Sequence, residues 1–139
     1  MLFLMKILFG VLLVFVFGNS SAQRILYAGQ DLNQPYNGQP IASIKPHWLI
    51  ANFAPKITVI YKDGKKQDID RDSIWGFEGN DHIVYRCYQK DIYEVKHIDD
   101  LIMYSNAASR YRDVRYGKTL DGPLYGTKSK ARKDSSINQ

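Results

Sequence analysis

Residues 57–71 read ITVIYKDGKKQDIDR. The first five are β-branched or aromatic, which is the composition that β-strands prefer. The Asp63-Gly64 pair that follows is a strong signal for a tight hairpin, because both residues tolerate the positive φ angles that such turns require. Residues 67–71 are therefore expected to return as an antiparallel partner strand. This hairpin predicts a mainly β fold.

Further strand signals follow on the C-terminal side of this hairpin. Apolar runs at 82–88, 92–96 and 101–104 are separated by short stretches of turn residues. Four or five short strands with short turns predict a small antiparallel meander, rolled into a sandwich or an open barrel-like sheet. Residues 99–112 have a helical alternative with Asp99 as its N-cap. The strand is favoured because 101–104 follows the preceding run at a turn-like spacing.

On the N-terminal side the chain is polar and rich in turn residues. A short strand is expected near 25–27, followed by a loop that includes the turn-rich residues 33–38. Residues 46–54 fit either a short helix or an extended segment, and the pattern does not choose between them. Near the other end, 119–125 is expected to be a turn flanked by a last short strand.

The N-terminus has the pattern of a signal peptide, predicted at residues 1–22. An apolar block at 7–17 follows Lys6, and the small residues Ser20 and Ala22 favour cleavage after Ala22. The block is shorter than the about 20 apolar residues that span a membrane. We therefore expect export to the periplasm or the cell exterior, with no membrane span after signal cleavage.

The rest of the chain is expected to be one β-rich domain with a basic tail. The domain is assigned to 23–126 with its core at 56–105, and the tail, 127–139, is expected to be disordered. From residue 110 onward, eight Lys or Arg oppose three Asp, a net charge of +5, whereas 23–109 has ten against eleven. Such a tail can adhere to anionic surfaces, although a solubilising end is the more ordinary explanation. Nucleic acid is not an expected partner of an exported protein.

Several blocks in the second half of the chain form a pattern that resembles a known group of proteins. They are Tyr61-Lys62-Asp63-Gly64, Asp72-Ser73-Ile74-Trp75-Gly76-Phe77, Tyr85-Arg86, Tyr93-Glu94-Val95, Ile102-Met103-Tyr104 and the later 116–125. The pattern is similar to that of short exported β-rich proteins of Bacteroidetes bacteria without an assigned activity. The resemblance covers roughly 57–125 and implies a compartment and a style of fold. It supplies no catalytic residues.

Four aromatic side chains are the candidate structural or binding residues: Trp75, Phe77, Tyr85 and Tyr93. Trp75 and Phe77 lie two residues apart, so in an extended strand they project to one face. A place in the core is favoured over an exposed aromatic platform for a sugar or peptide, because large aromatic residues commonly anchor small domains. Gly76 between them is expected to allow a bend or a bulge beside the Trp75 ring.

The sequence carries none of the common catalytic or metal-binding motifs, so neither a cofactor nor a metal ion is expected. Asp68, Asp70 and Asp72 alternate, but the positions that an EF-hand reserves for Gly and Glu hold Ser73 and Gly79. On a strand, the three carboxylates would form a solvated edge. The single cysteine, Cys87, excludes an intramolecular disulfide and is expected to be a buried thiol rather than a nucleophile.

Together these features predict an exported, non-enzymatic binding or structural module. A component of the cell envelope or another protein is the expected partner. Two alternatives stay open. One is a small hydrolase or inhibitor-like protein, in which Ser73 would act with His82 or His97 brought close by folding. The other is adhesion to anionic surfaces through the basic tail.

Overall fold

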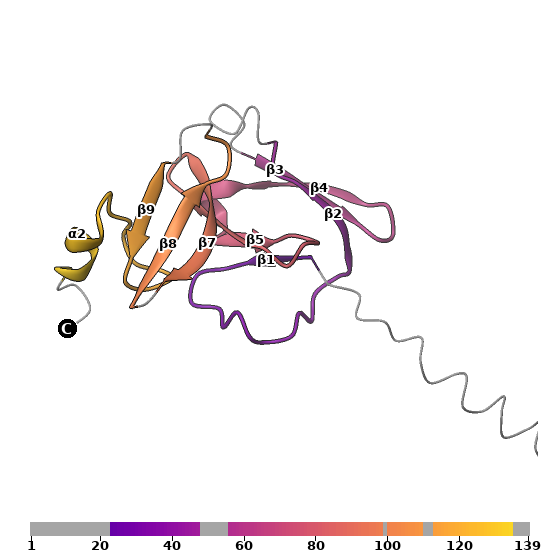
Figure 1. The fold of residues 1–139 in the computed structure, drawn as a ribbon. Helices are drawn as coiled ribbons and strands as arrows, with labels where there is room; N and C mark the ends of the chain where they lie inside the picture. The colour runs from indigo at the N-terminus through magenta and orange to yellow at the C-terminus, as the bar shows by residue number, and fades with distance from the viewer. Residues whose placement is uncertain (1–22, 48–55, 99, 110–112, 135–139) are drawn as a thin grey trace, which may run out of the picture.

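The computed structural model describes residues 23–47, 56–98, 100–109 and 113–134, and these form two antiparallel sheets (Figure 1). The larger sheet has six strands in the order β1-β5-β6-β7-β8-β9, and the smaller has three in the order β2-β3-β4. The predicted mainly β, antiparallel architecture is confirmed, and the described sheets do not close into a barrel. Among these residues, no helix is long and apolar enough to cross a membrane.

The elements are short and follow one another closely along the chain. The strands are β1 (Arg24–Leu26), β2 (Ile41–Lys45), β3 (Lys56–Tyr61), β4 (Lys66–Asp70), β5 (Gly76–Glu78), β6 (Val84–Tyr88), β7 (Asp91–Ile98), β8 (Leu101–Asn106) and β9 (Val114–Gly117). A 3-10 helix, η2 (Arg71–Ser73), links β4 to β5, and a short helix, α2 (Lys128–Arg132), follows β9.

The hairpin predicted at Asp63-Gly64 is confirmed as the connection between β3 and β4. Gly64 has φ = +88°, and its amide donates to the Tyr61 carbonyl over 2.9 Å. Along β3, Ile57 and Val59 are fully buried. The hairpin therefore presents alternate apolar side chains to the larger sheet, as the period of a strand requires.

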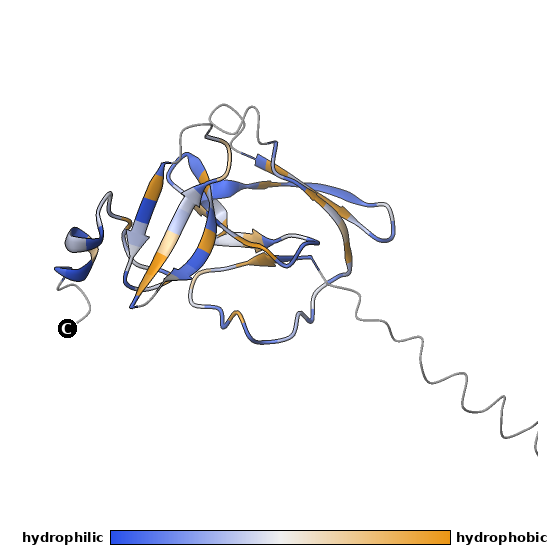
Figure 2. Ribbon diagram, viewed as in Figure 1, coloured by the Kyte–Doolittle hydropathy of each residue, from blue (hydrophilic) through white to orange (hydrophobic). Residues whose placement is uncertain are grey.

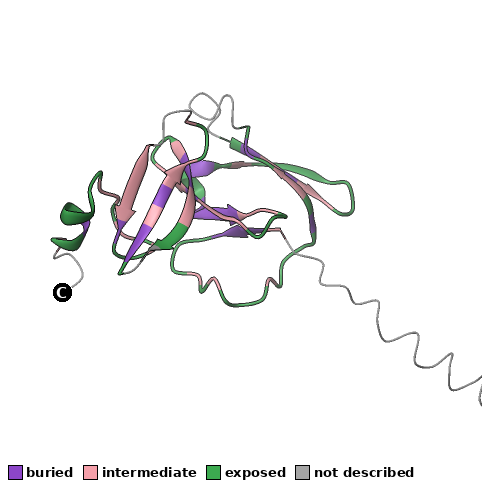
Figure 3. Ribbon diagram, in the orientation of Figure 1, coloured by how far each residue is buried: buried purple, intermediate pink, exposed green. Residues whose placement is uncertain are grey.

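The main core fills the space between the two sheets. Its members are apolar and come from both sheets and the β4–β5 connection: Ile25, Ile41, Ile57, Val59, Ile74, Phe77 and Ile92. Figure 2 shows hydrophobic segments on β1 and β5, and Figure 3 shows buried positions on the same two strands. The domain is thus a sandwich whose smaller layer covers part of the larger one.

The larger sheet is also covered on its other face, by the segment that follows β9. A second apolar cluster there contains Tyr93, Ile102 and Tyr104, with Leu120 and Leu124 packed against it. The neighbouring residues Ile92 and Tyr93 belong to different clusters, since successive side chains of β7 point to opposite faces.

Two strands, β2 and β9, were not predicted. β2 lies in the region expected to be a loop, and β9 lies where the apolar pattern fades. The expected short strand at 119–125 is reduced to a single bridge between Tyr116 and Tyr125. At 99–112, β8 confirms the favoured strand for residues 101–106.

The prediction of a disordered tail is wrong for residues 127–134. The Thr127 hydroxyl caps α2 by accepting from the Lys130 amide, and Ala131 is fully buried. Arg132 also makes a two-pronged ion pair with Asp100, with Nη2 to Oδ1 at 2.9 Å. The segment 127–134 is therefore ordered by a helix cap, one buried methyl group and one ion pair, although its composition indicates disorder. The predicted signal peptide and residues 48–55 lie outside the described part.

Candidate functional site

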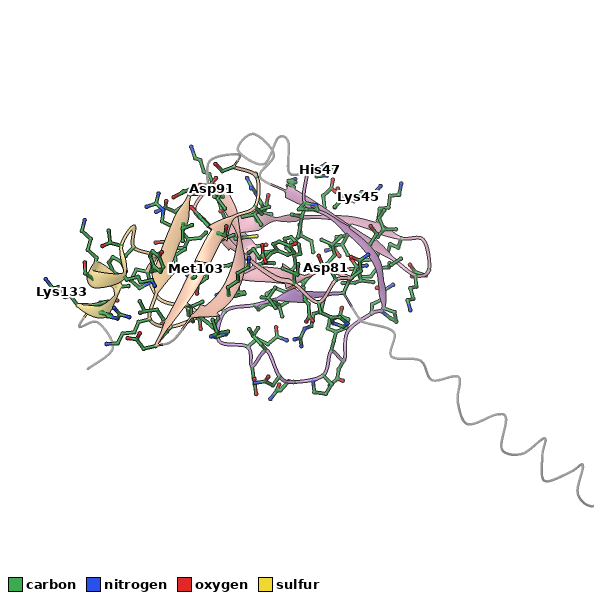
Figure 4. The ribbon with its side chains drawn as sticks, in the orientation of Figure 1. Lys45, His47, Asp81, Asp91, Met103 and Lys133 are labelled. Atoms are coloured by element: carbon green, nitrogen blue, oxygen red, sulfur yellow. The ribbon has the colours of Figure 1, made fainter. Side chains whose placement is uncertain are left out.

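A cavity of about 260 Å³ lies between β2 and the turn that connects β5 to β6. Its lining joins residues from distant parts of the sequence: Gln23, Ala42, Ser43, Ile44, Pro46, Phe77, Gly79, Asn80, Asp81 and Tyr85. Asp81, labelled in Figure 4, lies in the β5–β6 turn and is the one charged residue in this lining. Small-molecule sites usually measure about 300–1,000 Å³, so this cavity suits one side chain or a small polar group.

Gln23 closes the cavity on the β2 side with its side-chain amide. Nε2 donates to the Ala42 carbonyl and Oε1 accepts from the Ile44 amide, each over 3.0 Å. These two backbone groups belong to β2, whose only described neighbour in its sheet is β3. A side chain therefore satisfies backbone groups that a further strand would otherwise bind.

The opposite wall presents a carboxylate and a phenol close together. Asp81 Oδ1 accepts from the Ile83 amide over 3.0 Å, and the Tyr85 hydroxyl donates to the Asp81 carboxylate. Burial, then the negative charges of Asp81 and Glu94, raise the pKa of Tyr85 above its ordinary value. Tyr85 is therefore a neutral phenol, and its ring stacks on Phe77 with a centroid separation of 5.1 Å.

The structure divides the four candidate aromatic residues between the two faces of the larger sheet. Phe77 and Tyr85 line the cavity. Tyr93 is 3% exposed in the second cluster, and burial followed by the Asp91 charge raises its pKa to about 12. Trp75 is 7% exposed, and its indole N–H donates to the Leu120 carbonyl over 3.1 Å.

The expectation that Trp75 and Phe77 share one face is wrong. Trp75 precedes β5, so the strand alternation does not extend to it, and its ring reaches the face that Leu120 covers. Gly76 between them is required by a close approach of strands, because a Cβ at this position would lie 1.9 Å from the Tyr85 carbonyl oxygen.

Trp75 is one wall of an aromatic enclosure around Arg86. The guanidinium carbon lies 5.8 Å from the Trp75 ring centroid, 4.9 Å from that of Tyr88 and 5.3 Å from that of Tyr104. Arg86 is 5% exposed, and Nη2 donates to the Gly122 carbonyl over 2.9 Å. Ring faces and a carbonyl thus stabilise this buried cation. The arrangement attaches the 119–125 segment to the sheet.

The remaining candidates for chemistry lie outside the cavity. Burial raises the pKa of the Cys87 thiol to about 12, so it is protonated at neutral pH and is a poor nucleophile. Ser73 Oγ donates to the Asp70 carbonyl over 2.7 Å. His82 Nδ1 lies 3.4 Å from a Glu78 carboxylate oxygen. These contacts do not place a hydroxyl, an imidazole and an acid in the order that serine hydrolases use.

The three alternating aspartates do not form one set. Asp68 and Asp70 lie on β4, at the edge of the smaller sheet, but Asp72 lies in η2. Asp68 Oδ1 accepts from the Thr58 hydroxyl over 2.8 Å. Among the described residues, no three His, Cys, Asp or Glu side chains are grouped so that they could hold a metal ion.

Sequence reasoning did not identify most of the cavity. Gln23, Asn80 and Asp81 were not candidates, because Gln23 is 58 positions from Asp81 and only the fold brings them to one place. Asn80 and Asp81 follow Gly79, and their residue types indicate only a turn. No family model, curated protein or solved structure matches this chain.

Proposed function

We propose that this chain is a non-enzymatic binding module, exported to the periplasm or the cell exterior. The supporting observation is the cavity between β2 and the β5–β6 turn, which combines one carboxylate, a neutral phenol and side-chain amides. These groups suit recognition by hydrogen bonds and one negative charge. Its described lining contains no histidine, cysteine or lysine that would act as a base or nucleophile.

The two alternatives have less support. A hydrolase would need an activated nucleophile, but burial keeps the Cys87 thiol protonated and the Ser73 hydroxyl donates to a backbone carbonyl. Adhesion through the tail would need free cations. Within the tail, Arg132 is paired with Asp100 and the Lys128 ammonium lies 5.8 Å from the Tyr116 ring centroid, so Lys130 and Lys133 are its remaining exposed cations among the described residues.

Binding in the cavity is tested with two classes of probe on protein recovered after expression of the full chain. One probe is a pool of random-sequence decapeptides, and the other is a set of soluble peptidoglycan fragments. Amide NMR shifts locate the bound probe. We expect shifts at Asn80, Asp81 and Tyr85, and an affinity at least about tenfold lower in Asp81→Asn, because the one charged partner in the cavity is removed.

Asp68→Asn is the matched control, since it neutralises an aspartate on β4 outside the cavity. It should leave the affinity unchanged. If neither probe shifts the cavity amides, or if Asp68→Asn weakens binding as much as Asp81→Asn, the proposed function is wrong.

Export is tested separately by sequencing the N-terminus of the protein that the producing cells release. We expect Gln23 as the first residue. An N-terminus upstream of Gln23 would contradict cleavage after Ala22.

A further inference from the structure

We propose that the ligand of this cavity is an extended peptide, which adds as a strand to the free edge of β2 and places a basic side chain beside Asp81. The inference rests on the proposed binding function and names its ligand class. It begins with β2, which among the described strands pairs only with β3. The Ala42 carbonyl and the Ile44 amide are bonded by the Gln23 side chain instead of by a strand.

The Gln23 amide occupies the hydrogen-bonding groups that a peptide backbone would use. An added strand binds an exposed edge through carbonyl and amide groups of the main chain, and its alternate side chains enter neighbouring pockets. Nε2 of Gln23 supplies the donor and Oε1 supplies the acceptor. Two bonds from an incoming peptide would replace these two bonds, so the Ala42 carbonyl and the Ile44 amide would remain hydrogen-bonded.

The two edges of the smaller sheet differ in a way that favours β2. The β4 edge has exposed charged side chains at Lys66, Asp68 and Asp70, a feature that discourages pairing with another chain. β2 has the sequence IASIK, with a single charge at its last residue, Lys45. Charged side chains thus discourage strand pairing at the β4 edge. At the β2 edge the Gln23 side chain occupies the hydrogen-bonding groups, and an incoming strand can displace it.

The cavity gives the added strand its specificity. Ala42, Ser43 and Ile44 of β2 line one wall, and Asp81 and Tyr85 line the opposite wall. A side chain of the added strand that points into this space meets the Asp81 carboxylate and the stacked Phe77–Tyr85 rings. A lysine or arginine side chain can contact both, because its stem packs on the aromatic rings while its cationic head pairs with the carboxylate.

The test uses a blocked pentapeptide, acetyl-VTKVT-amide, and its glutamate counterpart, acetyl-VTEVT-amide, with protein recovered after expression of the full chain. We expect the lysine peptide to bind at least about tenfold more tightly than the glutamate peptide, and Asp81→Asn to remove this preference. Its binding should shift the Ile44 amide and slow the hydrogen exchange of that amide.

Gln23→Ala distinguishes strand addition from simple occupation of the cavity. Removing the competing amide should tighten binding of the lysine peptide by about threefold or more, because the peptide no longer has to displace two hydrogen bonds. Gln23→Asn, whose shorter side chain cannot span the same distance, should act in the same direction. Gln67→Ala, the same change on β4, is the control and should have no effect. Thermal melting verifies that each variant is folded.

The outcomes separate this inference from the proposed function. If peptidoglycan fragments shift the cavity amides but the lysine peptide does not, strand addition is wrong and the binding function stands. The same conclusion follows if the lysine peptide binds without affecting Ile44 and Gln23→Ala fails to tighten it. If no probe shifts the cavity amides, both the proposed function and the strand addition are wrong.

Discussion

The reactivity of the Cys87 thiol tests how strongly the larger sheet shields this side chain from solvent. It lies on β6 opposite Ile92 of β7 and packs against the main core. Desolvation raises its pKa from the ordinary 9.0 to about 12, while the charge of Arg71 acts in the opposite direction and that of Asp72 in the same direction. Because only the thiolate attacks a disulfide, this shift sets the reactivity of the thiol.

The expected effect follows from the pKa difference of about three units. At about pH 8, roughly one molecule in ten has a thiolate when unfolded, but only about one in ten thousand when folded. An aromatic disulfide reagent should therefore label native protein about a thousandfold more slowly than protein in guanidinium, as followed by absorbance. Labelling of native Cys87 within tenfold of the unfolded rate would refute this reasoning.

A displaced thiol provides the control. In Cys87→Ser combined with Ser129→Cys, the thiol lies at an exposed position of α2 and should react at nearly the unfolded rate. Slow reaction of this variant would show that the reagent, rather than the burial of Cys87, limits the rate.

The same pKa shift predicts loss of stability in alkali. The folded state binds the Cys87 proton more tightly, so this contribution is complete below about pH 9 and is lost as the pH rises to about 12. Over this interval it lowers the free energy of unfolding by up to about 1.4 kcal/mol per pH unit. Urea titrations of Cys87→Ser should show a shallower decline, and an identical decline would contradict the assignment. Burial of Tyr93 acts in the same direction above about pH 10.

Three substitutions test the packing of the sheets by denaturant unfolding. Gly76→Ala should lower the free energy of unfolding by more than about 3 kcal/mol, because its Cβ would lie 1.9 Å from the Tyr85 carbonyl oxygen; an unchanged midpoint would exclude this close approach. Trp75→Phe keeps a ring but removes the indole N–H that donates to the Leu120 carbonyl, so the free energy of unfolding should fall by about 1–2 kcal/mol. An unchanged free energy of unfolding would indicate that this bond contributes nothing. Arg24→Met removes a buried ion pair and two hydrogen bonds to loop carbonyls, so the free energy of unfolding should fall by about 3–5 kcal/mol. A gain in stability would contradict a stabilising role for this ion pair.

The parts of the fold that were predicted correctly depend on local signals. The Asp63-Gly64 turn and the β-branched residues beside it define β3 and β4 without reference to the rest of the chain. β2 lacks such a signal, because its register depends on β3 and it contains a bulge between Ile41 and Ser43. α2 was missed because its sequence indicates disorder, whereas one buried residue, Ala131, anchors it.

Only part of the candidate site could be predicted from the sequence by the same reasoning. Phe77 and Tyr85 were candidates because aromatic residues stand out in a short chain. Gln23 and Asp81 are ordinary surface residue types, and their role depends on contacts between segments far apart in sequence. The error at Trp75 has a local cause, since the strand begins one residue later, at Gly76.

The position of β1 has a consequence for the order in which the chain folds. β1 is the first described strand, yet it pairs with β5, so that Arg24 lies opposite Glu78 and an ion pair of 2.6 Å joins them. The β3–β4 and β7–β8 hairpins close over a few residues, whereas this pairing has to close a loop of 54 positions and is entropically the more demanding step. A nascent chain that ends before β5 would have no partner for Ile25 and Leu26. Until its second half has been made, the domain has an unpaired apolar strand at its beginning, and a chaperone or rapid synthesis would protect it from aggregation.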